Sequence, residues 1–215
     1  MNTNRLTGWL LMLGPIGMFL IWFILDPIII GEVADGLSPT EEALAGLQLN
    51  LDNEVLSNTL NLVGGFAFLG IFAGYTLLSR SLQGAGATFG TLCSLLFPIM
   101  LAIACIGFGL SVEAQSHLAE GYPEHAANLE VASNGMFGAF PMIVGLGLLL
   151  LGLGITRENG PLPAAMGWIL AIFGVLMFSG MYIGFGSTGI GPFVFMGWML
   201  VSLVSGILLI RKATT

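Results

Sequence analysis

The chain has 215 residues, of which 56% are hydrophobic and only 8% are charged. A soluble domain carries about 25% charged residues, so this composition excludes an ordinary soluble domain and indicates a protein embedded in hydrocarbon, where charges are costly. The net charge is −7, and the five basic residues form no cluster larger than a pair. Nucleic-acid binding, which depends on basic patches, is therefore excluded as well.

The few charges mark the ends of long uncharged stretches, and their signs are sorted. Eleven of the 12 acidic residues lie in alternate connections, and only Glu158 shares a connection with a basic residue. The basic residues lie near the two termini and in the remaining connections: Arg5, Arg80, Arg157, Arg211 and Lys212. Because Lys and Arg are enriched in cytoplasmic connections, we predict cytoplasmic termini and a multi-pass protein of the plasma or inner membrane.

The uncharged stretches predict an all-α bundle of six transmembrane helices, since a helix needs about 20 mostly apolar residues to cross a bilayer. We expect one membrane domain over residues 1–215, with spans at about 8–30, 55–79, 87–111, 131–156, 163–183 and 192–210. The last two spans divide a single uncharged stretch at a glycine-rich segment that ends in Pro192. Asp26-Pro27 lies near the outer end of the first span and is expected to break that helix early.

The first of two long acidic outer loops, 31–54, contains the signature of a helix start. Ser38 is followed by Pro39 and, three residues after the serine, by Glu41, which together predict a capping box and a short helix over about 39–48. Asp52 is a second candidate cap, leading into the next span. An apolar stripe at helical spacing favours packing on the membrane surface or on the outer helix ends: Leu44, Leu47 and Leu51.

The second outer loop, 112–130, combines histidines with carboxylates. We expect the third span to continue as a helix through Ala119 and to turn at residues 121–123. Imidazole, carboxylate and thioether groups are ligands for zinc or copper, and the candidate metal ligands are His117, His125, Glu113, Glu120, Met177 and Met181. The alternative is that the loop is merely solvated and that the methionines fill the core.

Polar residues within the spans are few. Asp26, Asn58 and Asn61 are predicted to form a hydrogen-bonded polar cluster near the outer membrane boundary. No ionisable residue falls near the middle of any span, which argues against proton-coupled transport, voltage sensing and intramembrane catalysis. The sequence therefore indicates no enzyme and identifies no cofactor.

The chain contains 32 glycines, which allow transmembrane helices to pack closely. Several recur at four or seven residues and so fall on one helix face: Gly70 with Gly74, Gly180 with Gly184, Gly145 with Gly152, and Gly147 with Gly154. We expect these seams to hold the bundle together within one chain rather than to form a dimer.

These patterns favour a non-catalytic accessory or scaffolding subunit of a larger membrane complex, with lipids and other membrane subunits as partners. The alternative is a permease for a small solute or copper that uses a methionine- and histidine-lined outer face. A permease requires a cavity that reaches the midplane and is lined by Asn61, Met177 or Met196.

Overall fold

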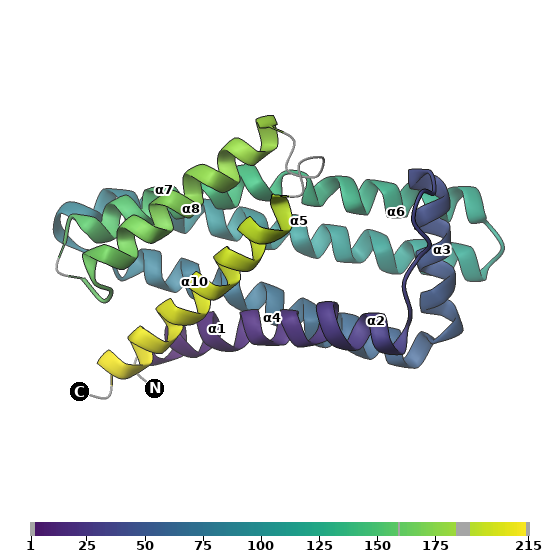
Figure 1. Cartoon of the computed structure of the whole chain (residues 1–215), viewed down its shortest axis with the longest axis horizontal. Helices are drawn as coiled ribbons and strands as arrows, with labels where there is room; N and C mark the ends of the chain where they lie inside the picture. The colour runs from purple at the N-terminus through teal and green to yellow at the C-terminus, as the bar shows by residue number, and fades with distance from the viewer. Residues whose placement is uncertain (1–2, 159, 184–189, 214–215) are drawn as a thin grey trace. The chain divides into compact units, whose positions relative to one another are not determined.

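The structure is a computed structural model that describes residues 3–158, 160–183 and 190–213, with no description of the side chains of residues 181 and 183. The described residues form helices joined by short connections, and none of them lies in a strand (Figure 1). The helices are α1 (Thr3–Met18), the π-helix η1 (Phe19–Leu25), α2 (Asp26–Ile29), α3 (Pro39–Asp52), α4 (Glu54–Arg80), the 3-10 helix η2 (Gly84–Gly86), α5 (Ala87–Ala119), α6 (Pro123–Phe137), α7 (Phe140–Thr156), α8 (Ala164–Ile183) and α10 (Gly191–Lys212).

Helices of membrane-spanning length and composition dominate the described part of the chain. Five stretches qualify: Thr3–Ile29, Glu54–Arg80, Gly84–Ala119, Pro123–Thr156 and Gly191–Lys212. The predicted span at 163–183 corresponds to α8, whose apolar described part, Ala164–Gly180, is shorter. The all-helical, multi-pass prediction is thus confirmed at the level of five candidate spans, whereas the count of six stays a prediction.

The chain divides into two compact units. Unit 1 comprises Met1–Ile16, Ala67–Leu101 and Ala139–Thr215, and unit 2 comprises Gly17–Phe66 and Ala102–Gly138. All five basic residues belong to unit 1, and every acidic residue except Glu158 belongs to unit 2. The sorting of charge along the sequence therefore coincides with the division of the fold, while the single membrane domain stays a prediction.

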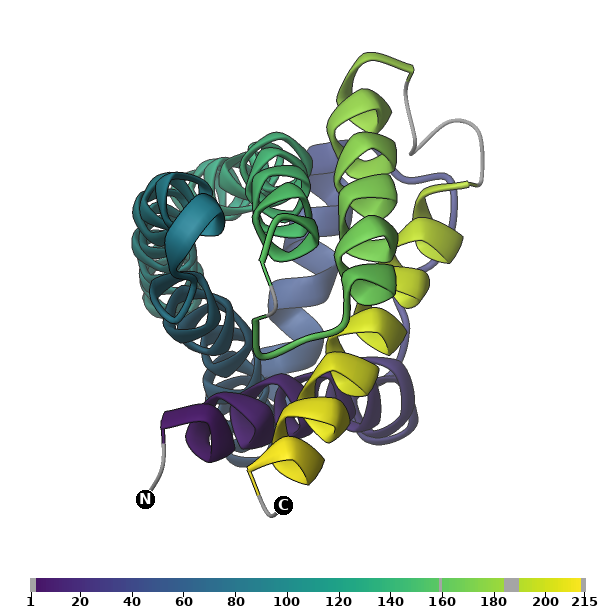
Figure 2. The same ribbon diagram turned by 90° about the vertical axis from the view of Figure 1, so that its left-hand side faces the viewer.

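In unit 1, glycines on α7 allow close contact with helices on two sides. Gly145 and Gly152 face α8, because a Cβ atom at either position would meet the α8 backbone. Gly147 faces the ring of Phe97 in α5, and Gly154 faces Leu82, the Cβ atom of Phe89 and the Gly86 carbonyl at and before the start of α5. Figure 2 shows α8 beside α7 and α10. The predicted seven-residue pairs thus each share a face, and both faces pack within the chain.

The other two predicted glycine pairs have different outcomes. A Cβ atom at Gly74 would lie 2.9 Å from Leu11 Cγ, so this glycine packs α4 against α1. A Cβ atom at Gly70 would make only ordinary contact, at 3.7 Å from Leu10 Cδ2. Gly184 lies outside the described residues, so the pairing of Gly180 with it stays a prediction.

Aromatic side chains fill the interior of unit 1. The Trp198 ring of α10 is fully buried, with its centroid 5.4 Å from Phe140 of α7 and 6.1 Å from Phe72 of α4. Tyr75 of α4 stacks on Phe97 of α5 at 5.1 Å. These rings bury large apolar areas and pair in offset and edge-to-face geometries, which stabilise their contacts further.

In unit 2, α3 packs against α6 around a small core. Leu47, Ala114 and Ala126 are buried there, with Leu118 and Leu129 packed against them. Leu47 of the predicted leucine stripe thus packs within unit 2, while the placement of the stripe at the outer side of a membrane stays a prediction. The turn at Gly121 has φ +87°, a value that favours glycine, and confirms the predicted turn between α5 and α6.

The predicted capping box is present. The Ser38 side chain accepts a hydrogen bond from the Glu41 N–H, and the Glu41 side chain accepts one from the Ser38 N–H at 2.9 Å. The prediction that Asp52 caps the next helix is wrong, however. Asp52 is the last residue of α3, and its carboxylate accepts a hydrogen bond from Gln48 Nε2 at 2.8 Å instead of capping α4.

The early break expected at Asp26-Pro27 does not occur. The chain remains helical to Ile29 because the preceding residues widen into the π-helix Phe19–Leu25. The Asp26 N–H bonds the Ile21 carbonyl, five residues back. Such widening accommodates a proline, which lacks an N–H and crowds the preceding turn.

Candidate functional site

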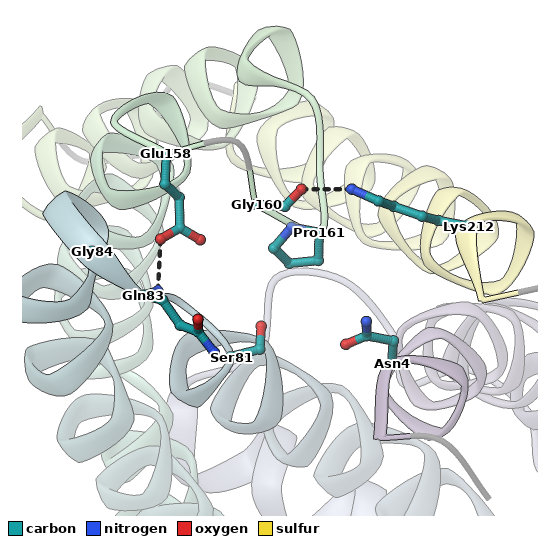
Figure 3. A pocket seen from close by; sticks show the side chains of 8 residues that line it. All are labelled: Asn4, Ser81, Gln83, Gly84, Glu158, Gly160, Pro161 and Lys212. Atoms are coloured by element: carbon teal, nitrogen blue, oxygen red, sulfur yellow. Dashed lines mark hydrogen bonds between the residues drawn. The ribbon is translucent and has the colours of Figure 1, made fainter.

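A polar pocket lies at the end of unit 1 where its basic residues are found. This basic-end pocket has a volume of about 430 Å³ and is lined by Asn4, Ser81, Gln83, Gly84, Glu158, Gly160, Pro161 and Lys212 (Figure 3). Its walls come from the start of α1, the α4–α5 connection, the α7–α8 connection and the end of α10. Four segments that are distant in sequence therefore meet around one opening.

Close helix contacts bring these segments together. A Cβ atom at Gly8 of α1 would meet the carbonyl of Gly206 on α10, at 2.8 Å. A Cβ atom at Gly86 would lie 2.7 Å from the carbonyl oxygen of Gly154 on α7. In the connection between α4 and α5, Gly84 has φ +53°, a conformation that favours glycine. Glycines thus allow both the close approach of the helices and the turn that forms one wall.

Two opposite charges line the basic-end pocket from different elements. Glu158 Oε2 accepts a hydrogen bond from the Gln83 backbone N–H at 2.6 Å, and Lys212 Nζ donates to the Gly160 carbonyl at 2.8 Å. Figure 3 shows the carboxylate and the ammonium group on different sides of Pro161. The two side chains, both within the described part, form no ion pair with each other. The pocket therefore presents a separated negative and positive charge.

Glycine also leaves room for the carboxylate of Glu158. A Cβ atom at Gly160 would collide with Glu158 Oε1, and one at Gly86 would lie 2.9 Å from Glu158 Oε2. The adjacent Arg157 turns away, with its guanidinium carbon 5.0 Å from the centre of the Phe89 ring in a cation–π arrangement. Arg157 and Glu158 are neighbours in sequence, but Arg157 packs on Phe89 whereas Glu158 lines the pocket.

A second pocket of about 520 Å³ adjoins the first and shares Glu158, Gly160, Pro161 and Lys212 with it. Its remaining lining is mostly apolar and includes one further cation: Leu162, Pro163, Ala164, Leu208 and Arg211. The volumes of both pockets lie within the roughly 300–1,000 Å³ of small-molecule sites. Together they offer a polar compartment beside an apolar one.

The sequence alone does not predict this site. One signal was available: Glu158 is the only acidic residue that shares a connection with a basic residue. The remaining lining residues are ordinary connection residues, and only the fold brings them together.

The predicted histidine site lies in unit 2, where α5 ends and α6 begins. His117 Nε2 lies 3.5 Å from Glu113 Oε1, and the rings of His117 and His125 are 6.0 Å apart. Glu120 is exposed in the following turn. Among the described residues, no group of three or more His, Cys, Asp or Glu side chains is placed to hold a metal ion.

The two methionines of the metal hypothesis lie on a different part of the chain. Met177 is buried in α8, in unit 1, whereas the histidines belong to unit 2. The side chain of Met181 lies outside the described residues. Metal binding by the full set stays a prediction.

Asn61, one member of the predicted polar cluster, belongs to a hydrogen-bonded group around Ser57. Asn61 Nδ2 donates to Ser57 Oγ at 3.3 Å, and Ser57 Oγ donates to Asn50 Oδ1 at 2.7 Å. Asn50 was not among the predicted residues. The cluster of Asp26 with Asn58 and Asn61 stays a prediction.

Seven serines and threonines are buried in the described part of the chain: Thr7, Ser57, Thr76, Ser79, Ser133, Ser202 and Ser205. Five of these hydroxyls donate to a carbonyl four residues earlier in their own helix, and the other two donate to Asn50 and to the Gly107 carbonyl. Their hydrogen-bonding protons are thus used inside the fold.

Comparison of the chain with family models, with curated proteins and with solved structures yields no match.

Proposed function

We propose that the protein is a non-catalytic, multi-pass membrane protein that acts as an accessory or scaffolding subunit of a larger membrane assembly. The observation that carries this proposal is the chemistry of the buried polar residues. Among the described residues, each buried serine or threonine donates its hydroxyl proton within the chain, and the buried Tyr75 hydroxyl lies 2.6 Å from Ser202 Oγ. Proton relays at membrane depth commonly rely on Asp, Glu or His, and the buried side chains of the described part include none of these, so this interior favours a structural role.

The packing of unit 1 supports the same role. Aromatic rings from α4, α7 and α10 fill its interior, and glycine seams bring α7 and α8 into backbone contact. Met177, which a permease would use to line a path, is instead a buried core residue. Neither pocket at the basic end is lined by Asn61, Met177 or Met196.

The outward surface of α8 offers a place for a neighbouring helix. The side of α8 that carries Gly167 and Gly174 packs on α7. Exposed apolar side chains follow at the helical spacing of one face: Trp168, Ile169, Ile172, Val175 and Leu176. In a membrane, this face is accessible to lipid and to partner helices, which associate through van der Waals packing of their side chains.

Site-specific photo-crosslinking in native membranes tests the proposal. A photoreactive residue at Trp168 or at Tyr122, which are 57% and 55% exposed, is expected to form discrete adducts with other polypeptides. The same residue at the fully buried Leu148 is the control and is expected to form none. Adducts with lipid alone at both exposed positions would contradict a subunit role.

A further inference from the structure

The basic-end pocket has features of a binding site for a ligand with two charges and an apolar part. It presents Glu158 on one side and Lys212 on the other, and the adjoining pocket adds Arg211 and the apolar side chains of Leu162 and Leu208. We propose that it binds the zwitterionic headgroup of an aminophospholipid such as phosphatidylethanolamine. In this arrangement, the lipid ammonium group lies near Glu158 and its phosphate lies near Lys212 and Arg211.

The position of the pocket suits a lipid. It lies where α1 and α8 begin and where α4, α7 and α10 end, at the end of unit 1 that carries basic residues. Lys and Arg near the ends of membrane helices extend toward the headgroup region, and basic pockets between membrane helices bind lipid headgroups. Leu208 and Ala164 line the second pocket, so an acyl-glycerol part can follow the headgroup along apolar surface.

The carboxylate distinguishes a zwitterionic headgroup from an anionic one. Glu158 is held toward the pocket by the Gln83 N–H at 2.6 Å and by the space that Gly86 and Gly160 leave. An anionic headgroup has no positive group to pair with this carboxylate, whereas an ammonium group would pair with it and donate hydrogen bonds. A quaternary ammonium group, as in phosphatidylcholine, carries the same charge but has no N–H to donate.

Lys212 and Arg211 are the cations that would bind the phosphate of the headgroup. Lys212 is held by the Gly160 carbonyl at 2.8 Å, on the other side of Pro161 from Glu158. Arg211 lines the adjoining pocket, where a guanidinium group can bond two phosphate oxygens at once. The two pockets therefore offer a partner of opposite charge for each end of a phosphoethanolamine group.

Lipid titrations followed by native mass spectrometry of the purified full chain in detergent test this proposal. The probes are phosphatidylethanolamine, phosphatidylcholine and phosphatidylglycerol with identical acyl chains, and soluble glycerophosphoethanolamine as a competitor. The wild type is expected to bind phosphatidylethanolamine about tenfold more tightly than phosphatidylcholine, the effect of one charge-assisted bond. Glu158→Gln is expected to remove this preference and to leave phosphatidylglycerol binding unchanged or stronger.

The basic residues supply a matched pair of variants. Lys212→Gln is expected to weaken the binding of all three lipids by about tenfold. Arg80 is an exposed residue at the same end of unit 1 that does not line the pocket. Arg80→Gln is therefore expected to leave the binding of all three lipids unchanged. Equal binding of phosphatidylethanolamine and phosphatidylcholine by the wild type would overturn the proposal, and so would an unchanged preference in Glu158→Gln. Competition by glycerophosphoethanolamine as strong as that of the lipid would assign the pocket to a soluble ligand and would also overturn it.

Discussion

The hydroxyl oxygen of Tyr75 lies 2.6 Å from Oγ of Ser202 and joins α4 to α10 in the interior of unit 1. Ser202 Oγ also lies 2.8 Å from the Trp198 carbonyl oxygen. A serine has one proton, and a carbonyl can only accept, so Ser202 donates to Trp198 and Tyr75 donates to Ser202. The two hydroxyls therefore have unequal roles, although they share one hydrogen bond.

This direction predicts an asymmetry between two conservative variants. Tyr75→Phe removes a donor and leaves Ser202 bonded to Trp198, so we expect a loss of about 1 kcal/mol in the free energy of unfolding. Ser202→Ala leaves the buried Tyr75 hydroxyl unpaired, and we expect a loss of about 2 kcal/mol. Reversible unfolding in mixed micelles measures both values.

Ser205→Ala is the control for that comparison, because Ser205 bonds only the Val201 carbonyl of its own helix. It is expected to change stability by less than about 0.5 kcal/mol. A larger loss for Tyr75→Phe than for Ser202→Ala would reverse the assigned donor.

The glycine seam between α7 and α8 predicts a second contrast. A Cβ atom at Gly152 would meet the Gly167 carbonyl and the Ala171 N–H, so Gly152→Ala must push α8 away and is expected to destabilise by about 2 kcal/mol. Gly109→Ala on α5 meets open space and is expected to be neutral or to stabilise by up to about 1 kcal/mol, because alanine favours helix. Unfolding in mixed micelles checks both, and equal effects would show that close packing does not explain the seam.

The sequence predicts local and periodic features of this fold well. Uncharged runs identify five candidate spans, seven-residue spacing identifies the two faces of α7, and Ser38 with Glu41 identifies the start of α3, since each depends on neighbours within a few turns. Features that depend on contacts between distant segments were not predictable. The basic-end pocket joins Asn4, Ser81, Glu158 and Lys212 from four segments, and only the fold brings these residues together.

The capping box predicts a pH dependence at the start of α3. Hydrogen bonds from the side chain and backbone of Ser38 hold the pKa of Glu41 below its ordinary value of 4.5. A lowered pKa in the folded state means that the ionised carboxylate stabilises the helix start. This contribution is fully present above the ordinary pKa and is lost as pH falls through the lowered one.

Carbon-13 NMR titration of the Glu41 carboxyl group measures this effect. The wild type is expected to titrate below 4.5, and Ser38→Ala is expected to raise the pKa toward that ordinary value. Amide protection in the first turn of α3 should decrease over the same pH range as the carboxyl group titrates in the wild type. An identical Glu41 titration in both proteins would exclude the capping box as its cause.

The charge pattern of the sequence predicts the orientation in the membrane. In a background with Cys93→Ala and Cys105→Ala, a membrane-impermeant maleimide added to intact cells is expected to label Glu124→Cys. Glu158→Cys is expected to react only after permeabilisation, because basic connections stay on the cytoplasmic side. The opposite pattern would invert the predicted topology.

The mass and composition of the native particle test the subunit role most directly. Native membranes would be extracted in mild detergent, and the particle that contains this chain would be purified and analysed by native mass spectrometry. A subunit is expected to occur in a particle much larger than the 22.6 kDa chain, with other polypeptides at fixed stoichiometry. A lone monomer or a homo-oligomer would contradict the subunit role and would favour a permease.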